Sequence, residues 1–287
     1  MATPWDRAAA GYLAEWVPRF VPYHLDLVRE LTLGDRQRVL VTSAGPGQEV
    51  LAVARALGDD GFVRATDQSG EMVRICSEQV HKARFLTRIE CGVADAADAG
   101  GGPWDAVLCA FGLWQIGDRA GREHALRSWR DSLAPLGKVG ILTWGPPDGQ
   151  QPFERLAEVL FELEPSLHVP SSHIDAERDT MGKMFQAGGL QMVRHTVVRH
   201  TLNFPSNEAF IRAMSEACTW RRIWEELGEA RMERVASRFY DVMGGPDAPL
   251  SFSPPATVAI ASLPSADVEL EARPSMRVPN PSKPPPA

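Results

Sequence analysis

Short apolar runs alternate along the chain with longer segments whose apolar positions recur at helical spacing. The runs that predict strands are 38–43, 62–67, 86–91, 104–110 and 137–144, and the amphipathic segments that predict helices between them are 47–57, 69–83 and 120–133. Short apolar strands that alternate with helices are typical of a parallel sheet covered on both faces. The pattern therefore predicts an α/β fold.

The segments on either side of this alternating region differ in pattern. Two amphipathic helices, 5–17 and 21–31, precede the first strand, and the segments predicted after Trp144 are helices at 152–163 and 175–187, a long strand at 192–204, one or two helices within 206–243 and a last strand at 255–264. We predict three parts: an N-terminal helical lid at 1–33, a main domain at 34–263 with a helical insertion at about 206–243, and a disordered, proline-rich tail at 264–287.

Composition narrows the class of protein. The formal net charge of −7 argues against a nucleic-acid-binding surface, which needs concentrated Lys and Arg. No apolar run approaches the roughly 18 residues of a membrane helix, and the N-terminus lacks the pattern of a signal peptide, so we expect a cytoplasmic protein. We also expect a monomer or homodimer. The four cysteines form no CxxC pair and have no histidine at metal-ligand spacing, which predicts reduced, mostly buried thiols and no metal site.

A glycine-containing turn follows the first strand, in the stretch VLVTSAGPGQEVL. Gly45 and Gly47 would let a ligand approach the backbone next to the positive end of a helix. However, Val50 stands where a dinucleotide fingerprint needs a third small residue, and there is no Gly-Lys-Ser/Thr sequence. The turn therefore predicts neither a dinucleotide site nor a P-loop.

Two more loops carry ligand-type residues at predicted strand ends. Asp67 lies 20 positions after Gly47, where a carboxylate can accept both hydroxyls of a ribose, although a solvated strand-end aspartate is the simpler alternative. Ser69 is a plausible helix N-cap, and Met72 could lie across an adenine ring. Asp95 follows the third strand. Three such loops in succession indicate a ligand-binding crevice at one edge of the sheet.

These segments together resemble a known family. VLVTSAGPGQ, the D-x-S-x-x-M of ATDQSGEM, the Asp-Ala after the third strand, WDAVLCAFGLWQIGD and LRSWRDSLAPLGKVGILTW follow in order the pattern of class I S-adenosylmethionine-dependent methyltransferases. The pattern is most similar to the ubiquinone and menaquinone methyltransferases, well over 5–145 and loosely over 150–263. The resemblance implies a Rossmann-like, seven-stranded, mostly parallel sheet in which 192–204 and 256–263 form the final antiparallel pair.

The resemblance also implies a set of cofactor-binding residues for S-adenosylmethionine. They are Ala44, Gly45 and Gly47 at the methionine part, Asp67 with Gln68 and Met72 at the ribose, Asp95 with Ala96 at the adenine, and Phe111 at the end of the fourth strand. The chain departs from the family at Val41, where an acidic residue is usual, and at Ser43, where glycine is usual. These departures predict weaker cofactor binding or a shifted methionine moiety.

Methyl transfer from a sulfonium is an in-line displacement that depends chiefly on positioning. We expect the acceptor site above the fourth and fifth strands, with substrate-binding candidates Tyr12, Tyr23, Trp114, Gln115, Trp144 and Trp220. The catalytic group is not identified by the sequence, and its candidates are His24, His173 and Gln115, with His168 as a further replacement base. The aromatic content favours methylation of O, C or N on a hydrophobic small molecule, which we place in secondary metabolism.

Two alternatives remain. Val41, Ser43 and the absence of histidine near Trp114 would also suit a cofactor-binding protein that catalyses a cyclisation or rearrangement without methyl transfer. A non-enzymatic interaction module would instead present Trp220 and Trp224 to a partner, although burial against the protein's own sheet explains these residues at least as well.

Overall fold

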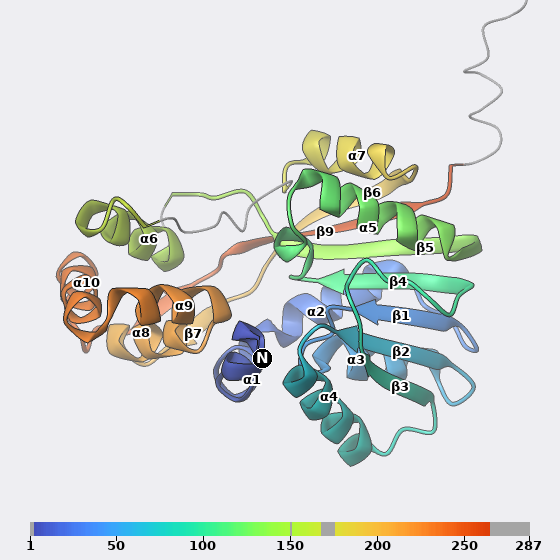
Figure 1. Cartoon of the computed structure of the whole chain (residues 1–287), viewed down its shortest axis with the longest axis horizontal. Helices are drawn as coiled ribbons and strands as arrows, with labels where there is room; N and C mark the ends of the chain where they lie inside the picture. The colour runs from blue at the N-terminus through green and yellow to red at the C-terminus, as the bar shows by residue number, and fades with distance from the viewer. Residues whose placement is uncertain (1–2, 150, 168–175, 265–287) are drawn as a thin grey trace, which may run out of the picture.

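A seven-stranded sheet forms the centre of the protein (Figure 1). The structure is a computed structural model that describes residues 3–149, 151–167 and 176–264. In spatial order the strands are β3 (Arg88–Val93), β2 (Phe62–Asp67), β1 (Arg38–Thr42), β4 (Trp104–Ala110), β5 (Leu133–Trp144), β9 (Pro255–Ser262) and β6 (Gln191–Arg199). Only β9 runs antiparallel to its neighbours in this sheet. The predicted Rossmann-like, mostly parallel sheet is confirmed.

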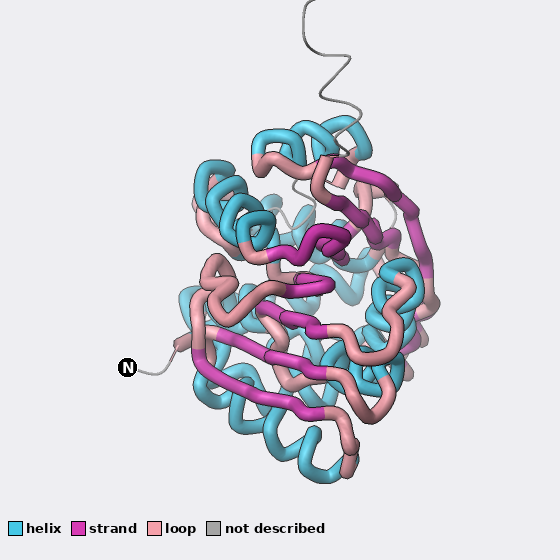
Figure 2. Tube along the Cα trace, turned by 90° about the vertical axis from the view of Figure 1, so that its right-hand side faces the viewer, coloured by secondary structure: helices cyan, strands magenta, loops and turns pink. Residues whose placement is uncertain are grey.

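Helices cover both faces of the sheet, as Figures 1 and 2 show. One face carries α2 (Val17–Leu31), α3 (Gln48–Leu57) and α4 (Gly70–Ala83), and the other carries α5 (Arg119–Asp131) and α7 (Arg178–Ala187). Strand β1 shows why both faces need cover: Val39 and Val41 enter the first core, while Leu40 enters the second. Burying each such side chain contributes roughly 1.5–3 kcal/mol.

A second group of elements, the helical lobe, lies beyond one end of the sheet (Figure 1). It contains α6 (Pro152–Leu163), α8 (Asn207–Ser215), α9 (Cys218–Leu227), α10 (Glu229–Val242) and the two-stranded sheet β7 (Leu202–Phe204) and β8 (Leu250–Phe252). Helix α1 (Pro4–Glu15) packs against α8 and α9 of this lobe and against α4 of the main domain. A short 3₁₀ helix, η1 (Leu113–Gln115), follows β4.

The prediction of one long strand at 192–204 was wrong. The strand breaks at His200, so that β6 joins the main sheet and β7 pairs with β8 in the helical lobe. Tyr23 of α2 holds this break, because its hydroxyl donates to the Pro254 carbonyl at 2.7 Å and accepts from the His200 N–H at 3.1 Å. His200 Nε2 also lies 2.6 Å from the Asp26 carboxylate. The local alternation of apolar and polar residues does not indicate such contacts between distant segments.

Two other predictions in this region need correction. Residues 206–243 form three helices rather than one or two, and the breaks fall at Glu216–Ala217 and at Gly228, whose φ is +72°. Strand β8 was not predicted at all. The predicted disordered tail lies outside the described residues, except for Pro264.

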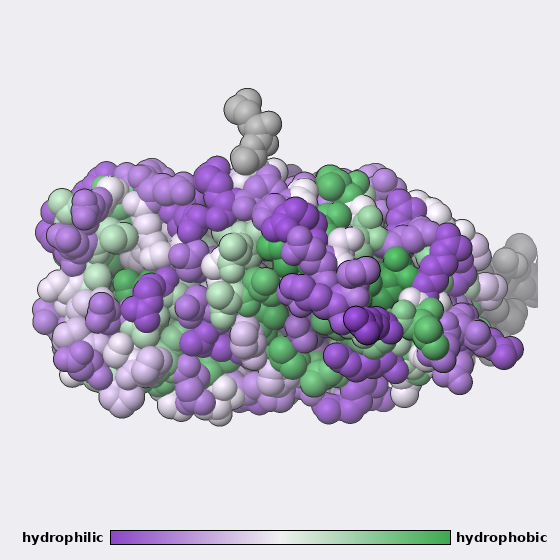
Figure 3. Space-filling model, turned by 90° about the horizontal axis from the view of Figure 1, so that it is seen from below, coloured by the Kyte–Doolittle hydropathy of each residue, from purple (hydrophilic) through white to green (hydrophobic). Residues whose placement is uncertain are grey.

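The surface and the thiols agree with the composition. Figure 3 shows polar residues over most of the face seen from below, with hydrophobic residues in smaller separate areas. Cys76 and Cys109 are buried, Cys91 is half-buried, and all three are free thiols, as predicted. None of the helices within the described ranges is both long and apolar enough to cross a membrane.

Gly47 is the glycine on which the first turn depends. Its φ is +92°, a conformation that L-residues with a Cβ rarely adopt, and it precedes α3 directly. A Cβ added to Gly47 would lie 2.6 Å from Cys76 Sγ in α4. The residue is therefore required both for the backbone turn and for the close packing of α3 and α4.

We expect Gly47→Ala to lower the free energy of unfolding by about 2–4 kcal/mol, since backbone strain and overpacking add. Gly70→Ala is the matched control, because Gly70 begins α4, lacks a positive φ and has open space around its Cβ position. Urea denaturation of both variants measures the difference. Equal stability of the two variants would contradict this account of the turn.

Candidate functional site

The turn after β1 is closed by backbone hydrogen bonds. The Ala44 N–H donates to the Thr66 carbonyl of β2 at 2.9 Å, and the Gly47 N–H donates to the Ala44 carbonyl at 2.9 Å. Ser43 has a φ of +53°, a left-handed conformation usually taken by glycine. Its side chain occupies the space beside Gly112, where a Cβ would lie 2.5 Å from Ser43 Oγ. A glycine at position 112 thus accommodates the serine at 43.

Asp67, at the end of β2, connects two of the three loops. One carboxylate oxygen accepts from the Gly45 N–H and the other from the Ser69 N–H, each at 2.9 Å. Burial raises the pKa of Asp67, and the charges of Glu49 and Asp6 raise it further, while the two N–H donors oppose the shift. Each oxygen keeps acceptor capacity beyond its backbone bond. The carboxylate is thus fixed in orientation and still able to accept from a ligand.

The third loop, which follows β3, is held in place by hydrogen bonds to one of its carbonyl groups. The Ala96 carbonyl accepts from Thr42 Oγ1 of β1 at 3.1 Å and from Trp129 Nε1 of α5 at 2.8 Å. Asp95 is exposed and accepts from the Ala97 N–H at 2.8 Å, which holds the loop in a tight turn. The loops after β1, β2 and β3 therefore meet at one edge of the sheet.

These loops enclose a cavity, which we call the rim cavity. Its volume is about 280 Å³, and it is lined by Trp5, Tyr12, Ser43, Gly45, Asp67, Gln68, Met72, Asp95, Ala96, Ala110, Phe111, Gly112, Gln115, Ile116 and Gly117. Seven of the nine residues predicted to bind the cofactor are among them. Ala44 and Gly47 are not: Ala44 is buried in the core, and Gly47 packs against Cys76.

A buried carboxylate lies near the first turn, although Val41 itself is fully buried in the apolar core. Glu49, near the start of α3, is 3% exposed, and its Oε2 lies 3.0 Å from His24 Nδ1. The charge of Glu49 raises the pKa of both Tyr12 and Asp67, so it acts on residues of both α1 and the second loop. The chain thus carries an acidic group on α3 rather than at position 41.

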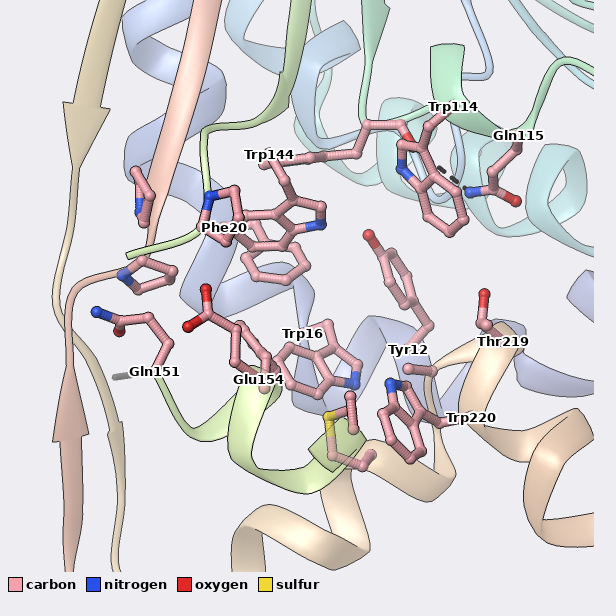
Figure 4. Close-up of a pocket in the computed structure, with 18 of the residues that line it drawn as sticks. Tyr12, Trp16, Phe20, Trp114, Gln115, Trp144, Gln151, Glu154, Thr219 and Trp220 are labelled. Atoms are coloured by element: carbon pink, nitrogen blue, oxygen red, sulfur yellow. Dashed lines mark hydrogen bonds between the residues drawn. The ribbon is translucent and has the colours of Figure 1, made fainter. Parts of the chain in front are cut away.

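The second cavity, which we call the aromatic cavity, lies between the sheet and the helical lobe (Figure 4). Its volume is about 300 Å³, and it is lined by Trp5, Tyr12, Trp16, Phe20, Phe111, Trp114, Gln115, Trp144, Pro147, Gln151, Phe153, Glu154, Ala157, Met214, Ala217, Thr219, Trp220, Pro254 and Pro255. Of the predicted substrate-binding residues, Tyr12, Trp114, Gln115, Trp144 and Trp220 line it. Tyr23 does not: it is fully buried behind Phe20 and Trp144 and bonds to the backbone.

The two cavities adjoin, because Trp5, Tyr12, Phe111 and Gln115 line both; we call these four residues the shared wall. Trp5 Nε1 donates to Gln115 Oε1 at 2.7 Å, so that α1 is bonded to η1 across the wall. Burial raises the pKa of Tyr12 well above its usual range, and the charges of Glu49 and Asp67 add to this effect. Tyr12 therefore stays protonated and can donate a hydrogen bond, but it cannot act as a base near neutral pH.

Helix α1 covers part of the rim cavity and is bonded to the N-terminus of α4. The Asp6 carboxylate accepts from Ser69 Oγ at 2.6 Å and from the Glu71 N–H at 3.1 Å, at the positive end of α4. These bonds hold the pKa of Asp6 well below its usual range. Together with the Trp5–Gln115 bond, they fasten the N-terminal helix over the edge of the sheet.

The catalytic candidates fall in different places. His24 lies beneath the sheet edge against Glu49 and Phe111 and lines neither cavity. Gln115 lines both cavities, but an amide is not a base, and its Nε2 donates to the Phe111 carbonyl at 3.4 Å. His168 and His173 lie outside the described residues.

Several lining residues were missed in the sequence. Trp5, Trp16 and Phe20 line the aromatic cavity beside Tyr12, and their spacing along the two N-terminal helices could have indicated one aromatic face. Phe153 and Glu154 at the start of α6 carried no such signal, because an acidic residue in the first turn of a helix is common for reasons of stability alone.

Comparison with known proteins agrees with this geometry. Residues 39–137 match the model of a methyltransferase domain. The chain is 26% identical over 172 residues to the ubiquinone/menaquinone biosynthesis C-methyltransferase UbiE of Ralstonia pickettii, a match that covers 55% of this chain and 69% of UbiE.

Two solved structures share the fold. YcgJ of Bacillus subtilis has a TM-score of 0.55 at 19% identity, over 85% of this chain and all of YcgJ (100%). Phosphoethanolamine N-methyltransferase 2 of Haemonchus contortus, solved with S-adenosyl-L-methionine, has a TM-score of 0.55 at 18% identity, over 91% of this chain and 57% of that chain. The matched domain, the relative and the shared fold together support a class I S-adenosylmethionine-dependent methyltransferase that resembles the ubiquinone and menaquinone methyltransferases.

Proposed function

We propose that S-adenosylmethionine binds in the rim cavity and that its methyl group passes to an acceptor held in the aromatic cavity. The observation that carries the proposal is the shared wall, since Trp5, Tyr12, Phe111 and Gln115 belong to both cavities. A cofactor in the rim cavity and an acceptor in the aromatic cavity would meet at this wall. Methyl transfer needs this positioning above any covalent machinery.

Within the rim cavity, the assignment follows the hydrogen-bonding capacity of each group. The Asp67 carboxylate would accept from the ribose hydroxyls with the acceptor capacity that the Gly45 and Ser69 N–H groups leave free. Met72, buried near this carboxylate, would lie against the adenine ring, and the Asp95 to Ala96 loop would bind its polar edge. The cavity also offers the Gly45 backbone to the methionine moiety.

We infer that the acceptor is a hydrophobic small molecule methylated on O, C or N. The aromatic cavity supports this class because most of its lining is aromatic or aliphatic, and its volume of about 300 Å³ lies at the lower limit for small-molecule sites. The cytoplasmic location and the role in secondary metabolism expected from the sequence are parts of the same proposal.

The two alternatives have less support. Trp220 and Trp224 are only 8% and 5% exposed, so they are not available to a protein partner in this arrangement. A protein that binds the cofactor without transferring methyl would need the same rim cavity. Only the reaction products distinguish such a protein from a methyltransferase.

Cofactor binding should depend on pH through Asp67. Protonation removes the charge that accepts from the ribose, and burial raises the pKa of Asp67 above its usual range, so affinity for S-adenosylhomocysteine should fall on acidification sooner than an exposed carboxyl of pKa about 4 would dictate. Asp67→Asn should weaken binding about tenfold or more and remove this part of the pH dependence. Isothermal titration calorimetry at a series of pH values measures both effects.

Asp60→Asn serves as the matched control, because Asp60 precedes the opposite end of β2 and is exposed in an ion pair with Arg36. It should bind S-adenosylhomocysteine as the unmodified protein does. Wild-type affinity and an unchanged pH profile in Asp67→Asn would refute the assignment of this carboxylate.

Methyl transfer itself is tested with S-adenosylmethionine carrying a deuterated methyl group and a panel of hydrophobic small molecules. We expect one labelled methyl group in the product for each S-adenosylhomocysteine formed, as measured by mass spectrometry. A product that forms without label and without S-adenosylhomocysteine would support the cyclisation or rearrangement alternative instead.

A further inference from the structure

Buried polar atoms without partners occur on the wall of the aromatic cavity, which is otherwise mostly apolar. Glu154 Oε2, Gln151 Oε1 and Trp114 Nε1 are all inaccessible to solvent and have no hydrogen-bond partner among the described residues. A buried polar group without a partner costs roughly 1–3 kcal/mol, and a charged group costs more. Each such group needs an explanation, and a ligand that supplies the missing partner is one.

Glu154 is the exceptional member of this set, because it brings a carboxylate into an aromatic site. Its Oε1 accepts from the Asp148 N–H at 3.2 Å, which accounts for one oxygen only. Its position in the first turn of α6 lets it stabilise the helix end, but that role does not account for a buried Oε2 without a partner in a residue that lines the cavity. Oε2 is thus left for another donor.

The described lining of the cavity supplies no counter-charge for this carboxylate. No Lys, Arg or His is found among the described residues that line it. The walls around it are instead the ring systems of residues such as Phe20, Trp144 and Phe153, and aromatic faces attract cations. A carboxylate together with aromatic faces complements an ammonium group better than it does a neutral or anionic one.

The position of Glu154 separates it from the reacting end of the cavity. Glu154 and Gln151 lie on one side of the cavity in Figure 4, with Gln115 and the Tyr12 hydroxyl on the other side. Glu154 lines the aromatic cavity alone, whereas Tyr12 and Gln115 belong to the shared wall. The carboxylate is therefore placed to hold the far end of an acceptor rather than to take a proton from the reacting atom.

We propose that the acceptor carries a protonated amine remote from the atom that is methylated, and that Glu154 binds this ammonium group while the aromatic rings enclose its carbon skeleton. Gln151 Oε1 offers the same group a second acceptor. This inference rests on the proposed function, since it specifies the class of acceptor for the same site. In it Glu154 is a specificity-determining residue and not a catalytic one.

The test uses three probes of similar shape: phenethylamine, phenethyl alcohol and phenylacetate. Their affinities are measured by isothermal titration calorimetry on the full-length protein, with and without saturating S-adenosylhomocysteine. We expect the amine to bind about tenfold more tightly than the alcohol, because it adds a charge-assisted hydrogen bond, and the carboxylate to bind most weakly. Equal affinities for the amine and the alcohol in the unmodified protein would overturn the proposal by themselves.

Glu154→Gln should bring the affinity for the amine down to that for the alcohol and leave the affinity for the alcohol within about twofold of wild type. Glu158→Gln is the matched control, because Glu158 lies on the same helix, is exposed and pairs with Arg155 on the surface. It should keep the full preference for the amine. A preference that survives in Glu154→Gln would also overturn the proposal.

Binding of S-adenosylhomocysteine and the melting temperature of each variant separate the possible failures. If S-adenosylhomocysteine binds but the amine is not preferred, the inference fails and the proposed function stands. If it does not bind to the unmodified protein, the proposed function fails. Should Glu154→Gln not fold, Glu154→Asp replaces it; this variant keeps the charge but withdraws it from the cavity, and an undiminished preference for the amine in it would contradict the assigned contact.

Discussion

The parallel direction of β1, β2, β3 and β4 is the constraint on which the candidate site depends. Because parallel strands end at the same edge, the loops that follow them meet there even though they are far apart in sequence. The Asp67 carboxylate then joins two of these loops by accepting from the Gly45 and Ser69 N–H groups. The same hydrogen bonds that stabilise the loops also orient the carboxylate at the rim cavity. The stability of the loops and the ability of Asp67 to accept from a ligand therefore depend on one set of bonds.

Helix α1 connects the main domain with the helical lobe and lines the cavities of both. It is fastened to α4 by Asp6 and to η1 by Trp5, and it packs against the helical lobe on its other side. Its side chains at Trp5 and Tyr12 consequently line both cavities. A change in the docking of this one helix would alter both the rim cavity and the aromatic cavity, so the proposed cofactor and acceptor sites would be physically coupled.

The aromatic cavity combines two kinds of wall with different energetic roles. Rings from α2, β5 and α6 supply apolar area, which favours binding of a carbon skeleton without fixing its orientation. Polar atoms at Glu154, Gln151 and Trp114 are few and directional, and they have no partner within the described part of the protein. Discrimination between acceptors therefore falls to the polar atoms, since a ligand that pairs with them gains hydrogen bonds that a purely apolar ligand does not make.

From the sequence alone we could predict the parallel strands, the helices that cover them and the three loops with Gly45, Asp67 and Asp95, because periodicity and strand-end residues are local signals. The three-dimensional structure was needed to show that the segment 192–204 divides at His200, whose N–H donates to the Tyr23 hydroxyl 177 positions away in the chain. It also showed that Gly47 packs on Cys76 and that Glu154 lines the aromatic cavity. Such contacts join segments with no local relationship, so spacing along the chain carries no signal for them.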